Sequence, residues 1–212
     1  MIHPTNRRAY WEAWYQKDEA PKHPTSFALF VAEQLPKAAA ILELGCGNAR
    51  DTAFFAQQGH PVIAIDASET AIANNTKRFG HLPCTFLPCD FADLGSLILP
   101  IPINALYSRF VLHAIPEPLE ENILDYAATI LPHGAWMFHE FRTTNDPLMR
   151  EGTSISANER LCGHYRRFID LGAFTEKLAK KGFSIESTFE GRGVAVLGKS
   201  DPVVARVAAR KP

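Results

Sequence analysis

Two glycines, Gly45 and Gly47, follow an apolar run of the chain and precede a stretch with helical character. Glycine lets the backbone turn sharply and lets a ligand approach without a Cβ in the way. Asp66 stands 19 residues after Gly47, at the end of the next apolar run. A carboxylate at this spacing is typical of sites that bind the two hydroxyls of a ribose. The turn and the acid therefore predict a site for a nucleotide-like ligand.

Two ligands suit such a turn. A dinucleotide favours a third glycine three residues after the second, and Arg50 stands there instead. Glu43 and Asp66 are better placed beside a ligand that carries positive charge. S-adenosylmethionine (SAM) has an ammonium and a sulfonium as well as a ribose and an adenine. We therefore favour SAM over NAD, and a glycine turn that binds nothing is the remaining interpretation.

At these positions the chain resembles the class I SAM-dependent methyltransferases. Residues 43–47 (Glu-Leu-Gly-Cys-Gly) match the first motif of that superfamily, and Asp66 matches the acid that ends its second strand. Residues 88–91 resemble the third-strand motif, and residues 106–109 resemble the end of the fourth strand. The resemblance covers about residues 25–200. It implies a Rossmann-like α/β fold with a seven-stranded, mostly parallel sheet, an antiparallel last strand and helices on both faces.

A closer similarity is to the thiopurine and tellurite-resistance methyltransferase group, through residues 45–52, 55–66 and the aromatic segment 11–15. The resemblance implies that Asp66 holds the ribose, Asp90 and Phe91 hold the adenine, and Ser108 lines the methionine channel. The predicted cofactor-binding residues are Tyr15, Glu43, Gly45, Cys46, Gly47, Asp66, Ala67, Asp90, Phe91 and Ser108.

The aromatic segment that contains Tyr10, Trp11, Trp14 and Tyr15 has two interpretations. One ring closes over the sulfonium by a cation–π contact, for which Tyr15 and Trp11 are the better candidates. Alternatively, the rings pack an N-terminal helix on the domain. We treat residues 1–24 as an N-terminal cap segment.

Candidate acceptor-side residues follow the fourth and fifth predicted strands. His113 is a candidate general base, with a helix-capping or partly exposed histidine as the alternative. Arg142, Arg166 and Arg167 are candidates for binding a carboxylate or phosphate of the substrate, with ordinary surface charge as the alternative. Tyr165, in the same stretch, is the second catalytic candidate. Residues 142–168 fit no regular element and are predicted to be an irregular insertion on the substrate side.

Short apolar strands alternate with helices along the chain, which predicts βαβ units. We expect strands at residues 38–44, 61–66, 84–88, 104–108, 135–141, 183–189 and 194–199. Helices are expected at residues 26–35, 50–58, 68–78, 118–131 and 170–181, with Ser68 as an N-cap. The short link at residues 190–193 predicts that the last two strands are antiparallel. Residues 201–211 resemble a short amphipathic helix.

The 212 residues favour a single domain over residues 1–212, and 46% hydrophobic residues supply a full core. The chain has 22 basic and 23 acidic residues, and its net charge of −1 gives no electrostatic case for binding nucleic acid. From residue 140 onward, however, basic residues outnumber acidic ones.

The four cysteines form no C-x-x-C motif, so neither a metal nor a disulfide framework is expected. We expect no membrane span and no signal peptide, and therefore a cytoplasmic protein. We also expect it to be a monomer or a homodimer.

These features predict an enzyme that transfers a methyl group from SAM to an O or S atom of a small metabolite. The arginines favour an acidic acceptor. A non-catalytic SAM-binding module and an NAD-dependent oxidoreductase are the alternatives, and Arg50 disfavours the second. Methylation of a macromolecule is a further alternative that the near-neutral charge disfavours.

Overall fold

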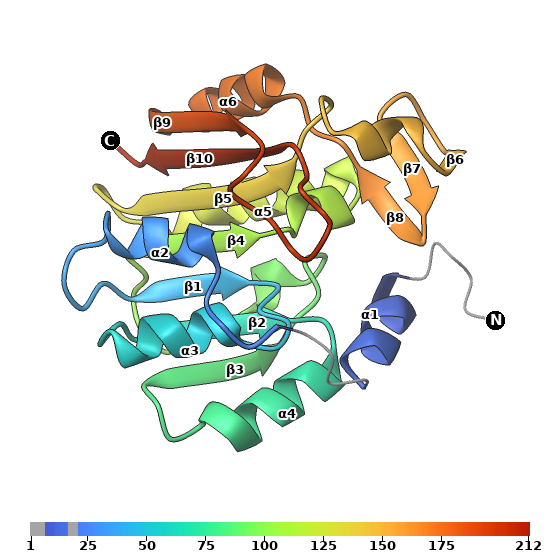
Figure 1. The fold of residues 1–212 in the computed structure, drawn as a ribbon. Coiled ribbons are helices and arrows are strands. Elements are labelled where there is room, and N and C mark those ends of the chain that lie inside the picture. Colours follow the sequence, from blue (N-terminus) through green and yellow to red (C-terminus); the bar gives the residue numbers. More distant parts are fainter. Residues whose placement is uncertain (1–6, 17–20) are drawn as a thin grey trace.

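The computed structural model of the chain describes residues 7–16 and 21–212 (Figure 1). Of the predicted cap segment, residues 1–6 and 17–20 lie outside the described residues. Seven strands form one sheet in the order β3-β2-β1-β4-β5-β10-β9. The strands are β1 (Ile41–Leu44), β2 (Val62–Asp66), β3 (Cys84–Pro88), β4 (Ala105–Arg109), β5 (Trp136–Arg142), β9 (Ser184–Gly191) and β10 (Val204–Arg210).

The strands from β3 to β5 pair in parallel, whereas β10 is antiparallel to both β5 and β9. Every residue of β1 and β2 is buried. Such continuous burial is typical of parallel strands that helices cover on both faces. Side chains alternate between the faces, so that Ile41 belongs to one hydrophobic cluster and Leu42 to the other.

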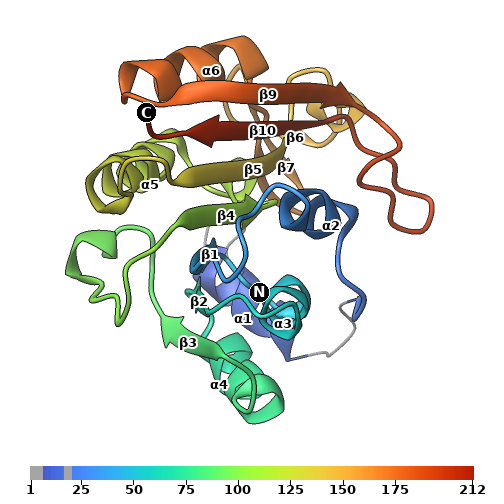
Figure 2. The same cartoon turned by 90° about the vertical axis from the view of Figure 1, so that its left-hand side faces the viewer.

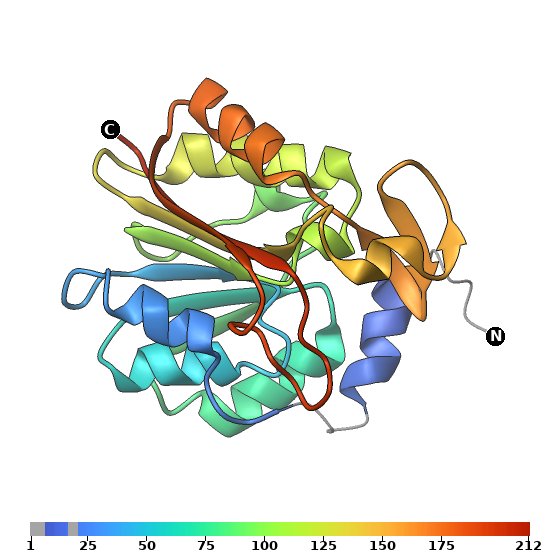
Figure 3. The same cartoon turned by 45° about the horizontal axis from the view of Figure 1, so that its top comes forward.

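Helices lie on both faces of the sheet, as Figures 2 and 3 show. Phe27 and Phe55 bring helices of the first half of the chain to one face, and Ile123 and Phe174 bring helices of the second half to the other. The helices are α1 (Arg7–Tyr15), α2 (Ser26–Ala32), α3 (Arg50–Gln57), α4 (Glu69–Phe79), α5 (Glu117–Ile130) and α6 (Leu171–Lys180). The predicted class I methyltransferase-like α/β fold is confirmed.

Two helix starts are fixed by side-chain caps. Ser68 precedes α4, and its hydroxyl accepts a hydrogen bond from the amide of Ala71 at 3.1 Å, as predicted. Asp170 caps α6 in the same way through the amide of Ala173, at 2.8 Å. Each cap satisfies a backbone donor that the first helical turn leaves unpaired.

The C-terminal prediction is wrong in two elements. The predicted strand at residues 194–199 is part of a loop, residues 192–203, which we call the cover loop. The predicted helix at residues 201–211 is instead strand β10, whose burial fits a strand with neighbours on both sides. The antiparallel pairing of the last two strands is confirmed, although the long cover loop makes it rather than the short link that we expected.

Residues 142–168 are more regular than predicted. After the end of β5 they contain a 3₁₀ helix (Pro147–Arg150) and a small antiparallel sheet of β6 (Thr153–Ser154), β7 (Glu159–Cys162) and β8 (His164–Arg167). Figure 1 shows the small sheet beside α1, at the end of the main sheet where β4 and β5 finish.

Two further 3₁₀ helices, outside residues 142–168, span Leu94–Ser96 and Leu112–Ala114. Within residues 7–16 and 21–212, no helix is both long and apolar enough to cross a membrane.

Candidate functional site

The turn after β1 requires glycine. Gly45 and Gly47 have φ angles of 64° and 54°, in the left-handed region. A Cβ on Gly45 would lie 2.6 Å from Cγ2 of Val111, and a Cβ on Gly47 would lie 2.4 Å from the hydroxyl of Tyr15. Side chains at these positions would therefore both strain the backbone and collide with neighbours. The glycines let the loop after β4 and helix α1 approach the turn closely.

Asp66, the last residue of β2, holds this turn in place. The amide of Gly47 donates to its Oδ2 at 2.9 Å, and the amide of Ser68 donates to its Oδ1 at 2.9 Å. Asn75 of α4 donates to the carbonyl of Gly47 at 2.7 Å. Burial raises the pKa of Asp66, and the two amides oppose that shift. Each carboxylate oxygen thus accepts a hydrogen bond from a neighbouring backbone amide.

Glu43 and Asp51 form a buried acidic pair behind the turn. Asp51 accepts hydrogen bonds from the amide of Thr25 at 2.8 Å and from the hydroxyl of Tyr107 at 2.7 Å. The hydroxyl of Thr52 donates to Glu43. Burial and the carboxylate of Asp51 raise the pKa of Glu43 well above its usual range. The surroundings thus favour the neutral form of Glu43 more than water does, and a cation beside it would favour the charged form.

A cavity of about 770 Å³ opens from this turn, within the usual size range for small-molecule sites. It lies at the carboxyl ends of the central strands, where ligands bind in open parallel sheets. Helix α1 and the cover loop also contribute to its wall. Nine of the ten predicted cofactor-binding residues line it: Tyr15, Glu43, Gly45, Cys46, Gly47, Asp66, Ala67, Asp90 and Phe91.

Helix α1 is attached both to α4 and to the small sheet. Glu12 accepts a hydrogen bond from the amide of Thr70 at 3.1 Å. The ring of Tyr10 packs 4.8 Å from that of His164 in the small sheet. Trp11, Trp14 and Tyr15 line the cavity. Both interpretations of the aromatic segment are therefore represented: Tyr10 packs the helix, and the other rings face the ligand space. The cation–π contact stays a prediction.

Ser108 does not line the cavity, which corrects its predicted place in the methionine channel. Its side chain is fully buried and lies 2.6 Å from Nδ1 of His139. Side chains alternate along β4, and the next residue, Arg109, lines the cavity instead. The prediction chose the correct strand end but the wrong face.

The buried His139 makes stability depend on pH. Burial lowers its pKa from 6.5 to about 3. In the unfolded chain the imidazole takes up a proton as pH falls below 6.5. In the folded protein the same imidazole stays neutral until the pH approaches about 3. Stability is therefore fully present above pH 6.5 and declines as pH falls toward 3. By pH 4 we expect this histidine to cost about 3 kcal/mol.

Urea unfolding at pH 7.5 and pH 4.5 checks this expectation. His139→Asn, which keeps a polar atom near Ser108, should reduce the loss of stability between the two pH values. His133→Gln, at an exposed histidine, is the control and should leave the loss unchanged. An identical pH dependence in the wild type and His139→Asn would contradict the assignment.

His113, the candidate base, lies beside the cavity but does not line it. Its Nδ1 accepts a hydrogen bond from the backbone amide of Arg142 at 3.2 Å. Burial, then the charge of Arg142, lowers its pKa well below 6.5. The ring is neutral at neutral pH, and its acceptor nitrogen is already used, which leaves Nε2 with the proton. In this state the ring can donate to a ligand but cannot take a proton from one. Its catalytic role stays a prediction.

The structure separates the remaining predicted residues. Arg142 lines the cavity and pairs with Asp146 at 2.8 Å. Arg166 donates to the carbonyl of Cys162 in the small sheet, and Arg167 forms a buried ion pair with Glu120. Neither lines the cavity.

Tyr165, the other candidate catalytic residue, is a buried residue of strand β8 in the small sheet. Its hydroxyl donates to Glu159, and the side chain does not line the cavity. Of the three predicted substrate-binding arginines, only Arg142 therefore reaches the ligand space, and a catalytic role for Tyr165 stays a prediction.

Sequence reasoning missed Arg50 and the cover loop as parts of the cavity wall. Arg50 served only as an argument against a dinucleotide, although its place in the turn was the available signal. Arg109 belongs to the strand end that the sequence places beside the cofactor, but it has no role of its own in that prediction. The cover loop was hidden because its apolar residues resemble a strand.

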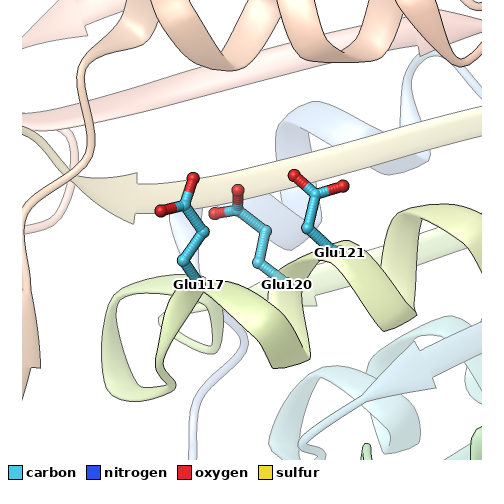
Figure 4. Close-up of side chains that lie close together, drawn as sticks. All are labelled: Glu117, Glu120 and Glu121. Atoms are coloured by element: carbon cyan, nitrogen blue, oxygen red, sulfur yellow. The ribbon is translucent and has the colours of Figure 1, made fainter.

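Three carboxylates of α5, shown in Figure 4, lie close enough to hold a metal ion: Glu117, Glu120 and Glu121. Lys177 of α6 pairs with each of the three at 2.7–2.9 Å. Arg167 also pairs with Glu120, and Lys181 with Glu121, so three cations face the three carboxylates. These carboxylates join α5 to α6 and lie outside the cavity wall.

A family model described as a methyltransferase domain matches residues 13–188 of the sequence. The chain belongs to this methyltransferase family. The match confirms the predicted enzyme class, a class I SAM-dependent methyltransferase with SAM as its cofactor. A comparison with curated proteins finds no match.

The methyltransferase is also similar in fold to several solved structures. A SAM-dependent methyltransferase from Methanosarcina mazei has a TM-score of 0.72 and 16% identity, over 86% of this chain and 96% of that chain. A TehB-like SAM-dependent methyltransferase from Corynebacterium glutamicum has a TM-score of 0.68 and 18% identity, over 99% and 100%. The glycopeptide N-methyltransferase MtfA in complex with SAM has a TM-score of 0.66 and 18% identity, over 90% and 95%. At these identities the likeness concerns the fold.

The residues at the turn fit the cofactor. Gly45, Gly47 and Asp66 all line the cavity, and the Asp66 carboxylate is fixed there by the amides of Gly47 and Ser68. Asp90 accepts a hydrogen bond from the amide of Ala92 at 3.0 Å through one oxygen, and the carboxylate lines the same cavity. The acids thus border the space in which a cationic adenosyl ligand would lie.

Proposed function

We propose that this methyltransferase transfers the methyl group of SAM to an O or S atom of a small, acidic metabolite. The observation that carries the proposal is the shared cavity: the wall that begins at Asp66 and the glycine turn continues to Arg109 and Arg142. Helix α1 and the cover loop complete this wall, which suits a small acceptor better than a macromolecule. The basic side chains in this wall suit an acidic acceptor.

SAM supplies the methyl group on a positively charged sulfonium when it is bound. The protein's task is to orient the two reactants and to exclude water. Asp66 binds the ribose hydroxyls, and Glu43 stabilises the ammonium of the amino-acid part. Tyr15, Trp11 and Phe110 give the cavity aromatic walls. Such walls favour a reaction in which positive charge on sulfur disappears as an anionic or neutral acceptor attacks.

We propose one domain over residues 1–212 that acts in the cytoplasm as a monomer or homodimer, on neither nucleic acid nor membranes. The net charge of −1 supports the exclusion of nucleic acid. The free cysteines Cys46, Cys84, Cys89 and Cys162 support a reducing compartment.

Ligand binding and product release test the function in order. SAM and S-adenosylhomocysteine (SAH) should raise the melting temperature of the full chain, and NAD should not. A metabolite extract with SAM should then yield SAH, and the extracted acceptor should carry the new methyl group on oxygen or sulfur. Binding without SAH release from any extract would instead identify a non-catalytic SAM-binding module. Methylation on nitrogen would overturn the proposed acceptor atom.

The raised pKa of Glu43 predicts that cofactor binding depends on pH. Below that pKa the free protein holds Glu43 neutral, and the ammonium of SAH favours the charged form. Binding therefore releases a proton, so the affinity for SAH should increase as pH rises through the Glu43 pKa.

Calorimetry of SAH binding from pH 5 to pH 7.5, in buffers of different ionisation enthalpy, checks this. Glu43→Gln should remove most of the increase in affinity, and Glu33→Gln, at an exposed site, should leave it intact. Asp66 also has a raised pKa, so the difference between the wild type and Glu43→Gln isolates the contribution of Glu43. Equal pH dependence in both proteins would contradict the prediction.

A further inference from the structure

The cations around the cavity are not all neutralised. Arg8 pairs with Glu69 at 2.7 Å, and Arg142 pairs with Asp146 at 2.8 Å. Arg50 also lines the cavity, and no described side chain forms an ion pair or hydrogen bond with it. Its nearest acid in sequence, Asp51, is turned toward Thr25 and Tyr107. Arg50 therefore presents a guanidinium with all its donors available to a ligand.

Arg109 adds further positive charge beside Arg50. Its Nε lies 2.8 Å from Oε1 of Glu140, but Oε2 of the same carboxylate accepts from Arg206 at 2.8 Å. One carboxylate thus serves two guanidinium groups, which leaves an excess of one positive charge. Burial lowers the pKa of Arg50, and the nearby charge of Arg109 lowers it further. An anion between the two arginines would relieve both effects.

Other parts of the cavity wall are apolar or aromatic. The guanidinium of Arg109 stacks 4.2 Å from the centre of the Phe110 ring. Three exposed apolar side chains line the same cavity: Trp14 on α1 is 39% exposed, and Val196 and Leu197 on the cover loop are 57% and 58% exposed. Exposed apolar groups at a cavity wall mark a site where a ligand buries apolar surface.

The cover loop is anchored to the same ion network. The guanidinium of Arg206 donates to the carbonyl of Val194 at 2.9 Å and to the hydroxyl of Ser26 at 2.7 Å. The amide of Gly193 donates to Asp201 at 2.8 Å, and Leu197 and Ser200 exchange two backbone bonds of 2.9 Å. The start of the cover loop is therefore attached to Arg206, which shares the carboxylate of Glu140 with Arg109.

We propose that Arg50 and Arg109 bind the carboxylate of the methyl acceptor, while Trp14, Val196 and Leu197 contact its apolar part. The acceptor is thus an organic acid with an aromatic or aliphatic body. This inference rests on the proposed function and replaces Arg166 and Arg167, which lie outside the cavity, as the acid-recognising residues. Two arginines that bind one carboxylate provide several charge-assisted hydrogen bonds.

Phenylacetate and its neutral amide, phenylacetamide, are matched probes that require no knowledge of the natural acceptor. Their binding to the full chain saturated with SAH is measured by calorimetry and ligand-observed NMR. Phenylacetate should bind at least about tenfold more tightly than phenylacetamide. Arg50→Gln and Arg109→Gln should each remove that preference, and Arg50→Lys should keep part of it. Leu197→Ser should weaken both probes by a similar factor.

Arg192→Gln is the matched control, because it removes an exposed charge of the same sign from the cover loop without altering the cavity wall. It should bind both probes like the wild type. Equal binding of acid and amide, no binding of phenylacetate, or full preference in Arg50→Gln would each overturn the proposal.

A rival role for Arg50 is recognition of the cofactor's own carboxylate. SAH carries that carboxylate, and methylthioadenosine lacks the amino-acid part. Under the proposal, Arg50→Gln leaves the affinity for both compounds within about twofold. A loss for SAH alone would assign Arg50 to the cofactor and overturn the proposal. Failure of the wild type to bind SAH would overturn the proposed function itself.

Discussion

The Asp66→Ala variant is expected to lose at least about a hundredfold in affinity for SAH. Asp66 lines the cavity, and two charge-assisted hydrogen bonds from ribose hydroxyls to its carboxylate would account for a loss of this size. The substitution also removes the acceptors of the Gly47 and Ser68 amides, which lie 2.9 Å from the carboxylate. Calorimetry measures the affinity, and circular dichroism and thermal unfolding show whether the fold remains.

A mutant cycle separates the ribose contact from the support of the turn. Asp66→Asn keeps one acceptor oxygen for the turn, and 2′-deoxy-SAH lacks one hydroxyl of the ligand. The wild type should lose affinity for the deoxy ligand, and Asp66→Asn should bind both ligands almost equally. Asp93→Ala, at an exposed acid outside the cavity wall, is the control and should behave like the wild type. A full penalty for the deoxy ligand in Asp66→Asn would assign the ribose to another residue.

Arg167→Ala should destabilise the protein by about 3 kcal/mol. Arg167 is 4% exposed and pairs with Glu120, which is 1% exposed. It also donates to the carbonyl of Ile115 at 3.2 Å and to that of Leu112 at 3.4 Å. Removal of the guanidinium leaves these buried acceptors without their donor, and only Lys177 still neutralises Glu120, at 2.7 Å.

Urea unfolding measures this loss, and Arg166→Ala is the matched control. Arg166 is half-buried and donates to a carbonyl of its own small sheet, so we expect a loss below about 1 kcal/mol. The comparison decides between the two roles considered for Arg167. Wild-type stability in Arg167→Ala, together with weaker binding of an acidic acceptor, would restore it as a substrate-binding residue.

The glycine turn and its acid were predictable because their geometry is local. Gly45 and Gly47 require positive φ angles, and the strand before them fixes where the turn lies. Asp66 ends the neighbouring strand, and parallel pairing of β1 with β2 places it beside the turn. The alternation of apolar runs with helical segments was enough to predict the parallel part of the sheet in the same way.

The acceptor end was less predictable because it depends on contacts between distant segments. Arg167 meets Glu120 across 47 positions of the sequence, and nothing near Arg167 indicates that partner.

The sequence at residues 204–210 favours a helix because alanine and arginine have high helix propensity, yet the segment is a strand. Its position inside the sheet overrides that preference, since Val204, Ala205, Val207, Ala208 and Ala209 are all buried.

The place of β10 between β5 and β9 has a consequence for how the molecule assembles. Until residues 204–210 arrive, β5 presents an open row of backbone donors and acceptors, and β9 has no neighbour within the main sheet. Such unpaired edges invite association between incomplete copies. Refolding at low protein concentration should therefore improve the yield of folded protein. A short peptide of the β10 sequence should compete with residues 204–210 for the position between β5 and β9.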